Sequence, residues 1–143
     1  MGEHSYEPVA PFRLRLPEGR EFVAKTKLRR VIVEAFEAHL DKVQLIGVNS
    51  QDMTTEEAHR VAVRYAEEFG LDRRPLDRWL RLRLAQRRAG REELLERAGA
   101  GDLSTPPIGR DGPVPAVEIN YTADDHLPSY VSVQFDWTKL GPG

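Results

Sequence analysis

Eight arginines between residues 72 and 91 are the side chains of this sequence with the clearest capacity for binding chemistry. The segment reads DRRPLDRWLRLRLAQRRAGR, and its two acids are Asp72 and Asp77. Over residues 73–91 the arginines outweigh Asp77 and give a charge of +7, so the rest carries about −9 because the whole chain has −2. A guanidinium group is planar and grips a carboxylate or phosphate with two hydrogen bonds. This uneven charge distribution indicates a basic surface that could face an acidic partner.

The arginine-rich segment is predicted to be a helix, although leucine and arginine alternate through RWLRLRL as they would in a strand. Asp72 suits an N-cap, Pro75 suits a first turn and Gly90 suits a left-handed end. The segment is also too long for a typical strand. Arg83 and Arg87 lie within the apolar arc of the helical wheel, so we expect their stems to reach outward to solvent or to meet acids. The apolar side carries Leu76, Trp79, Leu80, Leu82 and Leu84.

The opposite side of this helix carries the arginines that we expect to bind a partner. Arg78, Arg81 and Arg88 would grip acidic groups, with Arg74 and Arg91 flanking them. The competing interpretation is a set of surface ion pairs within the chain, each contributing about 0–1 kcal/mol. The acids available for such pairs are Glu34, Glu37, Glu67, Glu68 and Glu92.

Nucleic acid is an alternative partner for the same helix. A nucleic-acid-binding domain is usually basic, whereas this chain is net acidic. Aromatic residues between the arginines would favour single strands, but Trp79 is the only one there and is expected in the core. An acidic protein surface is therefore favoured over nucleic acid.

Other residues could support catalysis or metal binding, but each has a simpler interpretation. Asp124, Asp125 and His126 are adjacent in a predicted hairpin loop, where aspartate is a common turn residue. His39 falls on the apolar stripe of a predicted helix, which is typical of a core histidine rather than a general base, and His59 is expected to be solvated. The phosphate-loop, serine-hydrolase and zinc-peptidase motifs are absent. We therefore expect no catalytic, cofactor-binding or metal-binding residues, and keep a small enzyme with a dispersed His/Asp site as a second alternative.

Hydrophobic periodicity predicts an α+β domain over residues 11–143, preceded by a tail at 1–10. The strongest helix signal is MTTEEAHRVAVRYAEEFG, where Thr54 and Glu57 form a capping box and Gly70 ends the helix. The expected fold is a small mixed or antiparallel sheet of about five strands packed against three to four helices, in the order ββ-α-β-α-α-α-ββ. The predicted strands are 11–16, 20–25, 43–48, 116–122 and 130–137; the helices are 27–40, 55–69, the arginine-rich segment and 91–98; a proline- and glycine-rich loop covers 99–115.

Length and composition are those of a cytoplasmic globular protein. A chain of 143 residues is the size of one domain, and it contains no apolar run near the roughly 18 residues that span a bilayer. The absence of cysteine excludes disulfides, and no secretory signal is visible. The function we expect is a non-catalytic regulatory or adaptor protein that docks onto an acidic surface of a larger protein assembly. The transcription machinery would suit in charge and size; no membrane partner is expected, and the oligomeric state stays open.

Overall fold

The computed structural model describes residues 2–6, 12–35, 43–90, 98–101, 105–121 and 129–137. Its main element is an antiparallel sheet in which five strands, in the order β4-β5-β8-β7-β6, are extended by β1 at one edge. The fold is therefore α+β, as the sequence predicts. The strands of this sheet are β1 (Gly2–Tyr6), β4 (Leu28–Ala35), β5 (Leu45–Ser50), β6 (Ala98–Ala100), β7 (Val114–Asn120) and β8 (Tyr130–Asp136).

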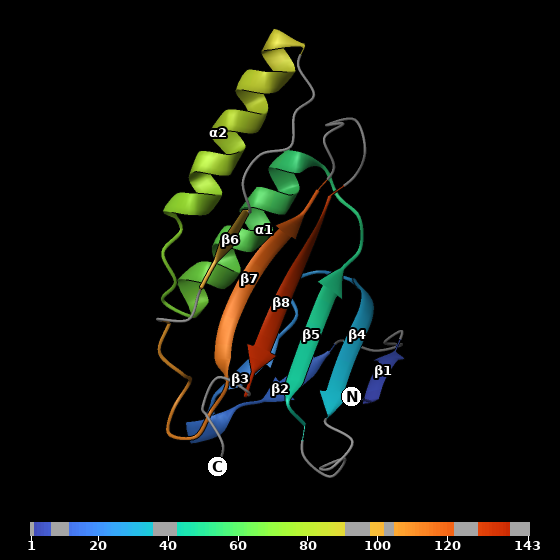
Figure 1. The fold of residues 1–143 in the computed structure, drawn as a ribbon, viewed down its shortest axis with the longest axis vertical. Helices are drawn as coiled ribbons and strands as arrows, with labels where there is room; N and C mark the ends of the chain where they lie inside the picture. The colour runs from blue at the N-terminus through green and yellow to red at the C-terminus, as the bar shows by residue number, and fades with distance from the viewer. Residues whose placement is uncertain are drawn as a thin grey trace.

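Two helices and a separate hairpin lie on one face of this sheet (Figure 1). The helices are α1 (Thr55–Glu68) and α2 (Arg74–Ala89), and the hairpin consists of β2 (Arg13–Arg15) and β3 (Glu21–Val23). α1 contacts β7 and β8, whereas α2 contacts α1 and the edge strand β6. Over the opposite face of the sheet, Figure 1 shows no helix or strand of the described residues. α2 therefore forms an outer element of the covered side.

The hairpin closes one end of the core and confirms the predicted pair of strands at 11–16 and 20–25. Its turn is a single 3-10 turn, η1 (Pro17–Gly19), in which Gly19 adopts a positive φ of 73°. Phe22 is fully buried, and its ring centroid lies 5.0 Å from that of Phe135 and 5.5 Å from that of Tyr65. The hairpin thus contributes an aromatic cluster rather than strands of the main sheet.

The helix predicted over 27–40 is wrong, because Leu28–Ala35 forms strand β4. β4 pairs with β1 on one side and with β5 on the other. The run from Val31 to Val33 is β-branched, which favours a strand, and Val31 is buried opposite Val48. Helical spacing is a weak local preference that pairing on both sides overrides. Residues 36–42 lie outside the described residues, and β1 falls within the segment for which the sequence predicts a tail.

α1 confirms the strongest prediction from the sequence. The hydroxyl of Thr54 accepts a hydrogen bond from the backbone N–H of Glu57 at 3.2 Å, which satisfies one free amide of the first turn. Gly70 follows the helix with a positive φ of 67°. The helix buries its small side chains completely against the sheet, so the two backbones approach closely. The buried residues include Ala58, Val61, Ala62, Tyr65 and Ala66.

The described residues contain two helices rather than the three to four that periodicity predicts. The fourth predicted helix, 91–98, falls outside the described residues over 91–97, and Ala98 belongs to β6. The loop predicted over 99–115 is shorter than expected at both ends, because β6 occupies its start and β7 begins at Val114. The predicted strands at 43–48, 116–122 and 130–137 are confirmed as β5, β7 and β8, with ends shifted by up to two residues.

Candidate functional site

One side of α2 fixes the helix to the body of the protein. Leu76, Trp79 and Arg83 lie on this side and are at most 2 % exposed. The ring centroid of Trp79 lies 5.4 Å from that of Tyr121, which directly follows β7. Because these three buried positions are three or four residues apart, they define the inner face of the helix and leave the opposite face to solvent.

The ends of α2 agree with the sequence in part. Gly90 adopts a positive φ of 67° and ends the helix, as predicted. The N-cap position is occupied by Arg73 rather than by Asp72. Asp72 still satisfies a first-turn amide, since its Oδ1 accepts the backbone N–H of Arg74 at 3.0 Å. The start signal is therefore real, but the helix begins one residue later than expected from an Asp72 cap.

Arg83 does not reach solvent, which excludes one of the two outcomes expected for the arginines in the apolar arc. Its side chain is 1 % exposed, and its guanidinium carbon lies 5.2 Å from the centroid of the Tyr121 ring. A guanidinium group stacks on an aromatic face more readily than an ammonium group because it is planar and weakly hydrated. Arg83 is therefore part of the structural side of α2 and is unsuited to binding a partner.

Three further arginines of α2 are neutralised by carboxylates of the same chain. Arg73 bonds Asp77 at 3.0 Å and Glu67 of α1 at 2.8 Å. Arg87, at the other end of the helix, bonds Glu56 of α1 at 2.7 Å. These two contacts join opposite ends of the helices, so α1 and α2 run antiparallel.

The third neutralised arginine is Arg74, one of the residues expected to flank the binding surface. It forms a salt bridge with Asp72 at 2.8 Å. Among the other acids expected to form internal pairs, Glu68 bonds Lys25 at 3.0 Å instead of an arginine of α2. Glu37 and Glu92 lie outside the described residues. The internal pairing that the sequence allows is thus realised for some arginines of α2.

The outer arginine stripe is the name used here for Arg78, Arg81 and Arg88. All three side chains are exposed, and within the described part of the chain they form no ion pair or hydrogen bond. Their spacings of three and seven residues place them on the face of α2 opposite its buried side. Arg91, the other expected flanking residue, lies outside the described residues. The structure therefore brings three of the five expected residues together as exposed cations without a carboxylate partner among the described residues, whereas Arg74 is exposed but paired with Asp72.

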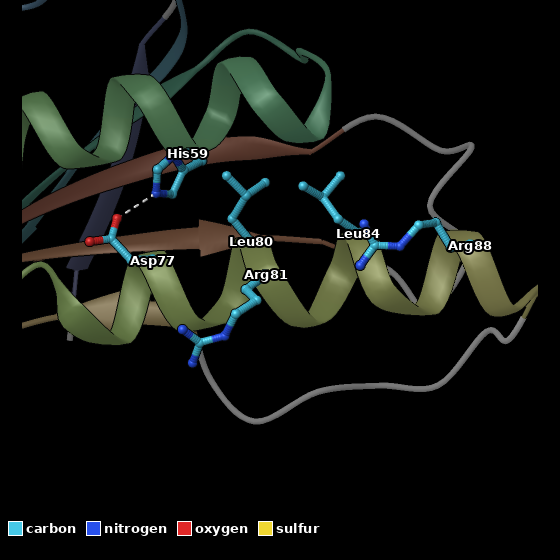
Figure 2. A pocket seen from close by; sticks show the side chains of 6 residues that line it. All are labelled: His59, Asp77, Leu80, Arg81, Leu84 and Arg88. Atoms are coloured by element: carbon cyan, nitrogen blue, oxygen red, sulfur yellow. Dashed lines mark hydrogen bonds and ion pairs between the residues drawn. The ribbon is translucent and has the colours of Figure 1, made fainter.

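A pocket that the sequence did not indicate lies between α1 and α2, beside the outer arginine stripe. Its volume is about 280 Å³, and it is open to solvent. Figure 2 shows His59 of α1 directed toward Asp77 of α2, with Nε2 and Oδ1 separated by 2.8 Å. The lining residues are His59, Asp77, Leu80, Arg81, Leu84 and Arg88.

His59 was expected to be solvated, but its side chain is only 15 % exposed. The short connection between the two helices does signal antiparallel neighbours. It does not give their register, which decides that His59 meets Asp77. The spacing of residues along the sequence therefore does not predict that His59 and Asp77 pair.

Hydrogen bonds fix the charge state of the carboxylates around α2. The hydrogen bond from Arg73 holds the pKa of Asp77 below its ordinary value of 3.8, against the opposing effect of partial burial, and the hydrogen bond with His59 adds to the lowering. Arg74 lowers the pKa of Asp72 in the same way, through side-chain and backbone hydrogen bonds. Both carboxylates are therefore ionised at neutral pH, and each is occupied by cations of its own chain.

The other candidates from the sequence are not assembled into a site by the described residues. His39 and the Asp124–His126 cluster lie outside them. Within the described ranges, no group of three or more metal-ligating side chains comes together. Pro113, directly before β7, and Pro115, inside β7, are fully buried, which favours a connector anchored to the body. None of the helices in the described part of the chain has the length and apolar character needed to cross a membrane.

A scan against protein-family models, a search of curated proteins and a search of solved structures each found no match.

Proposed function

We propose that this chain is a non-catalytic regulatory or adaptor protein that binds an acidic surface of a larger protein assembly through the exposed face of α2. The observation that carries the proposal is the outer arginine stripe. Its three guanidinium groups share one face of one helix and have no carboxylate partner among the described residues. An external carboxylate could pair with each of them without first breaking an ion pair to another described residue.

The stripe gathers three unpaired arginines on one helix face. Arg60 and Arg64 are also exposed and lack partners within the described residues, but they form only a pair, one turn apart on α1. Arg15, Arg30 and Arg110 are exposed and unpaired in the same sense, and they are dispersed over the hairpin, β4 and the loop before β7. The stripe spans about 15 Å along the helix axis, from Arg78 to Arg88, at 1.5 Å per residue. This length matches two or three carboxylates on one helix or strand of a partner.

The contact is expected to be fast to form and sensitive to salt. Exposed charges steer association and raise the on-rate, but each exposed pair adds only about 0–1 kcal/mol. Three such pairs do not give tight binding alone. This strength suits a regulatory protein whose attachment is reversible.

An acidic protein is favoured over nucleic acid because the surroundings of the stripe lack the features that nucleic acids use. Trp79 is 2 % exposed and packs on Tyr121, so it offers no stacking surface to bases. The chain as a whole carries −2, which repels a polyanion at long range.

The test is affinity capture with a charge-matched pair of triple variants. One variant reverses Arg78, Arg81 and Arg88 to Glu, and the other reverses Arg15, Arg30 and Arg110 to Glu. Both change the net charge equally, so a general electrostatic effect would appear in both. Each bait is incubated with a nuclease-treated extract of the native source, and bound proteins are identified by mass spectrometry. We expect the stripe variant to lose a partner that the wild type and the matched control retain.

The melting temperature of both variants should stay within a few degrees of the wild type. A stripe variant that still captures the same partner contradicts the proposal, and one that unfolds shows that these arginines are structural. Nucleic acid is tested on the wild type with labelled oligonucleotides. Neutralisation of phosphates produces a steep linear fall of log affinity with log salt concentration, and such a response would favour the nucleic-acid alternative.

A further inference from the structure

We infer that the pocket between α1 and α2 is an anchor site that receives one aliphatic side chain of the partner, flanked by carboxylates that pair with Arg81 and Arg88. This inference rests on the proposed function, since it specifies how the acidic partner is recognised. The pocket shares Arg81 and Arg88 with the outer arginine stripe. An apolar cavity therefore adjoins two cations that have no ion pair with any other residue the structure describes.

The apolar part of the pocket is formed by two leucines one turn apart on α2. Figure 2 shows the side chains of Leu80 and Leu84 pointing from α2 toward α1, with His59 on the facing helix. Both leucines are partly exposed although they lie between two packed helices. An apolar group placed between them would bury their remaining surface, at about 25 cal/mol for each Å² removed from water.

The size of the pocket suits a side chain better than a cofactor. Its volume of about 280 Å³ lies at the lower limit of the roughly 300–1,000 Å³ of typical small-molecule sites. The cavity is also open to solvent rather than enclosed. One leucine or isoleucine side chain would fit it while the attached backbone stays outside.

The charges around the pocket favour an acidic sequence on both sides of that side chain. Asp77 is the carboxylate among the lining residues, and it is already bonded to Arg73 and His59. Glu56, on the neighbouring turn of α1, is bonded to Arg87. The cations Arg81 and Arg88 thus remain for an incoming anion.

The spacing of Arg81 and Arg88 defines the motif further. Seven residues of helix separate their Cα atoms by about 10 Å along the axis, which corresponds to about three residues of an extended chain. In Figure 2 the guanidinium of Arg88 lies beside Leu84, whereas that of Arg81 extends away from α1. The expected ligand is therefore a short extended segment with an aliphatic residue between two acidic residues.

The experiment uses the full chain and three labelled pentapeptides measured by fluorescence anisotropy. The first has a central leucine between two pairs of glutamates, the second has alanine at the centre, and the third has glutamines in place of the glutamates. We expect the leucine peptide to bind about tenfold more tightly than the alanine peptide, because burying the larger side chain adds about 1.4 kcal/mol.

Two leucines of α2 provide a matched pair of variants. Leu84 lines the pocket, whereas Leu82 is 37 % exposed and is not among the lining residues. Leu84→Asn should abolish the preference for the leucine peptide, and Leu82→Asn should preserve it. If Leu84→Asn unfolds, Arg88→Gln and Arg78→Gln answer the same question: Arg88→Gln should reduce the preference for the leucine peptide, while Arg78→Gln should weaken both glutamate peptides equally.

The outcomes separate the anchor site from the proposed function. Equal affinity of the wild type for the leucine and alanine peptides, both tighter than the glutamine peptide, overturns the anchor site and leaves acidic docking in place. Equal affinity for the glutamate and glutamine peptides overturns acidic docking itself. A leucine preference that survives Leu84→Asn in a folded variant places the apolar contact elsewhere and also overturns the anchor site.

Discussion

The arginines of α2 fall into two groups that differ in what surrounds their guanidinium groups. Arg73 and Arg87 bond carboxylates of α1 at opposite ends of the helix, and Arg83 is buried against Tyr121. Arg78 and Arg81, by contrast, are exposed and have no partner among the described residues. Arg88 belongs with this second group, although it directly follows the paired Arg87. A change of one position along the helix thus separates an arginine that holds the helix in place from one that faces solvent.

The comparison shows that the charge of a segment does not by itself indicate a binding surface. Part of the +7 that the sequence displays is used to join α2 to α1 and to fill the space beside Tyr121. Among the described residues, Arg78, Arg81 and Arg88 are left together on one face, because the first group occupies the inner and lateral faces. Removing members of the first group should change stability, and removing members of the second should change binding.

The largest expected effect comes from Arg83→Ala, which removes a buried side chain of the first group. The substitution leaves a cavity and loses the contact with the Tyr121 ring, so the free energy of unfolding should fall by about 3 kcal/mol. The measurement is urea denaturation followed by circular dichroism. Arg78→Ala serves as the control and should stay within about 0.5 kcal/mol of the wild type. If both substitutions cost the same, the division of the arginines into two groups is mistaken.

The sequence predicts the elements of this fold better than it predicts which side chains meet. α1 and α2 are correct because caps, stops and apolar stripes all indicate the same structure, from Thr54 at one end to Gly90 at the other. β4 is missed because LRRVIVEAF has helical spacing and β-branched residues at once. That conflict is decided by the pairing of this segment with β1 and β5, and neither strand is part of the local sequence from which the helix is predicted.

The candidate site was predictable only in its composition. Helical spacing correctly separates Arg78, Arg81 and Arg88 from the apolar side, since that separation is local. The burial of Arg83 depends on Tyr121, 38 positions further along the chain. The pocket depends on the register between two helices, which brings His59 to Asp77. The spacing of residues along the sequence predicts neither the Arg83–Tyr121 contact nor the His59–Asp77 contact.

A smaller effect on stability is expected for Asp77→Asn, which keeps the shape but removes the charge that Arg73 and His59 contact. The pKa of Asp77 is lowered in the folded protein, chiefly by the hydrogen bond from Arg73. A lowered pKa contributes stability that is present above the ordinary value of 3.8 and is lost as the pH falls through the folded value. Since the side chain is 41 % exposed, solvent screening limits the loss at pH 7 to about 0.5–1 kcal/mol.

The measurement for Asp77→Asn is the difference in unfolding free energy from the wild type between pH 7 and pH 2. The difference should be constant near neutrality and should close as the pH falls below 3.8, because the wild-type carboxyl group then becomes protonated. If the difference in unfolding free energy between Asp77→Asn and the wild type does not depend on pH, the charge of Asp77 does not contribute to stability.

Glu56→Gln should have a still smaller effect, because it weakens a single exposed contact between the two helices. The Arg87–Glu56 pair is short at 2.7 Å, but both side chains are more than 40 % exposed. Such pairs contribute about 0–1 kcal/mol and are screened by salt, so we expect a loss of about 0.5 kcal/mol that disappears in 1 M sodium chloride. Urea denaturation at low salt and in 1 M sodium chloride measures this loss, and a loss of the same size at both salt concentrations would show that the contact is not chiefly electrostatic.

Asp72→Asn frees Arg74, an outer-face arginine that is paired within the chain, and would add it to the second group; it therefore tests the comparison most directly. Arg74 lies four residues before Arg78, on the same face as the outer arginine stripe, but Asp72 neutralises it. Asparagine can still accept the backbone N–H of Arg74, so the start of α2 should be preserved. The freed guanidinium extends the stripe by one turn, and the association rate with the acidic partner should rise about twofold at low salt. Stopped-flow association at 20 and 500 mM salt would show the gain at the lower concentration only. An unchanged rate at both would mean that the stripe ends at Arg78, and that the first turn of α2 lies outside the contact.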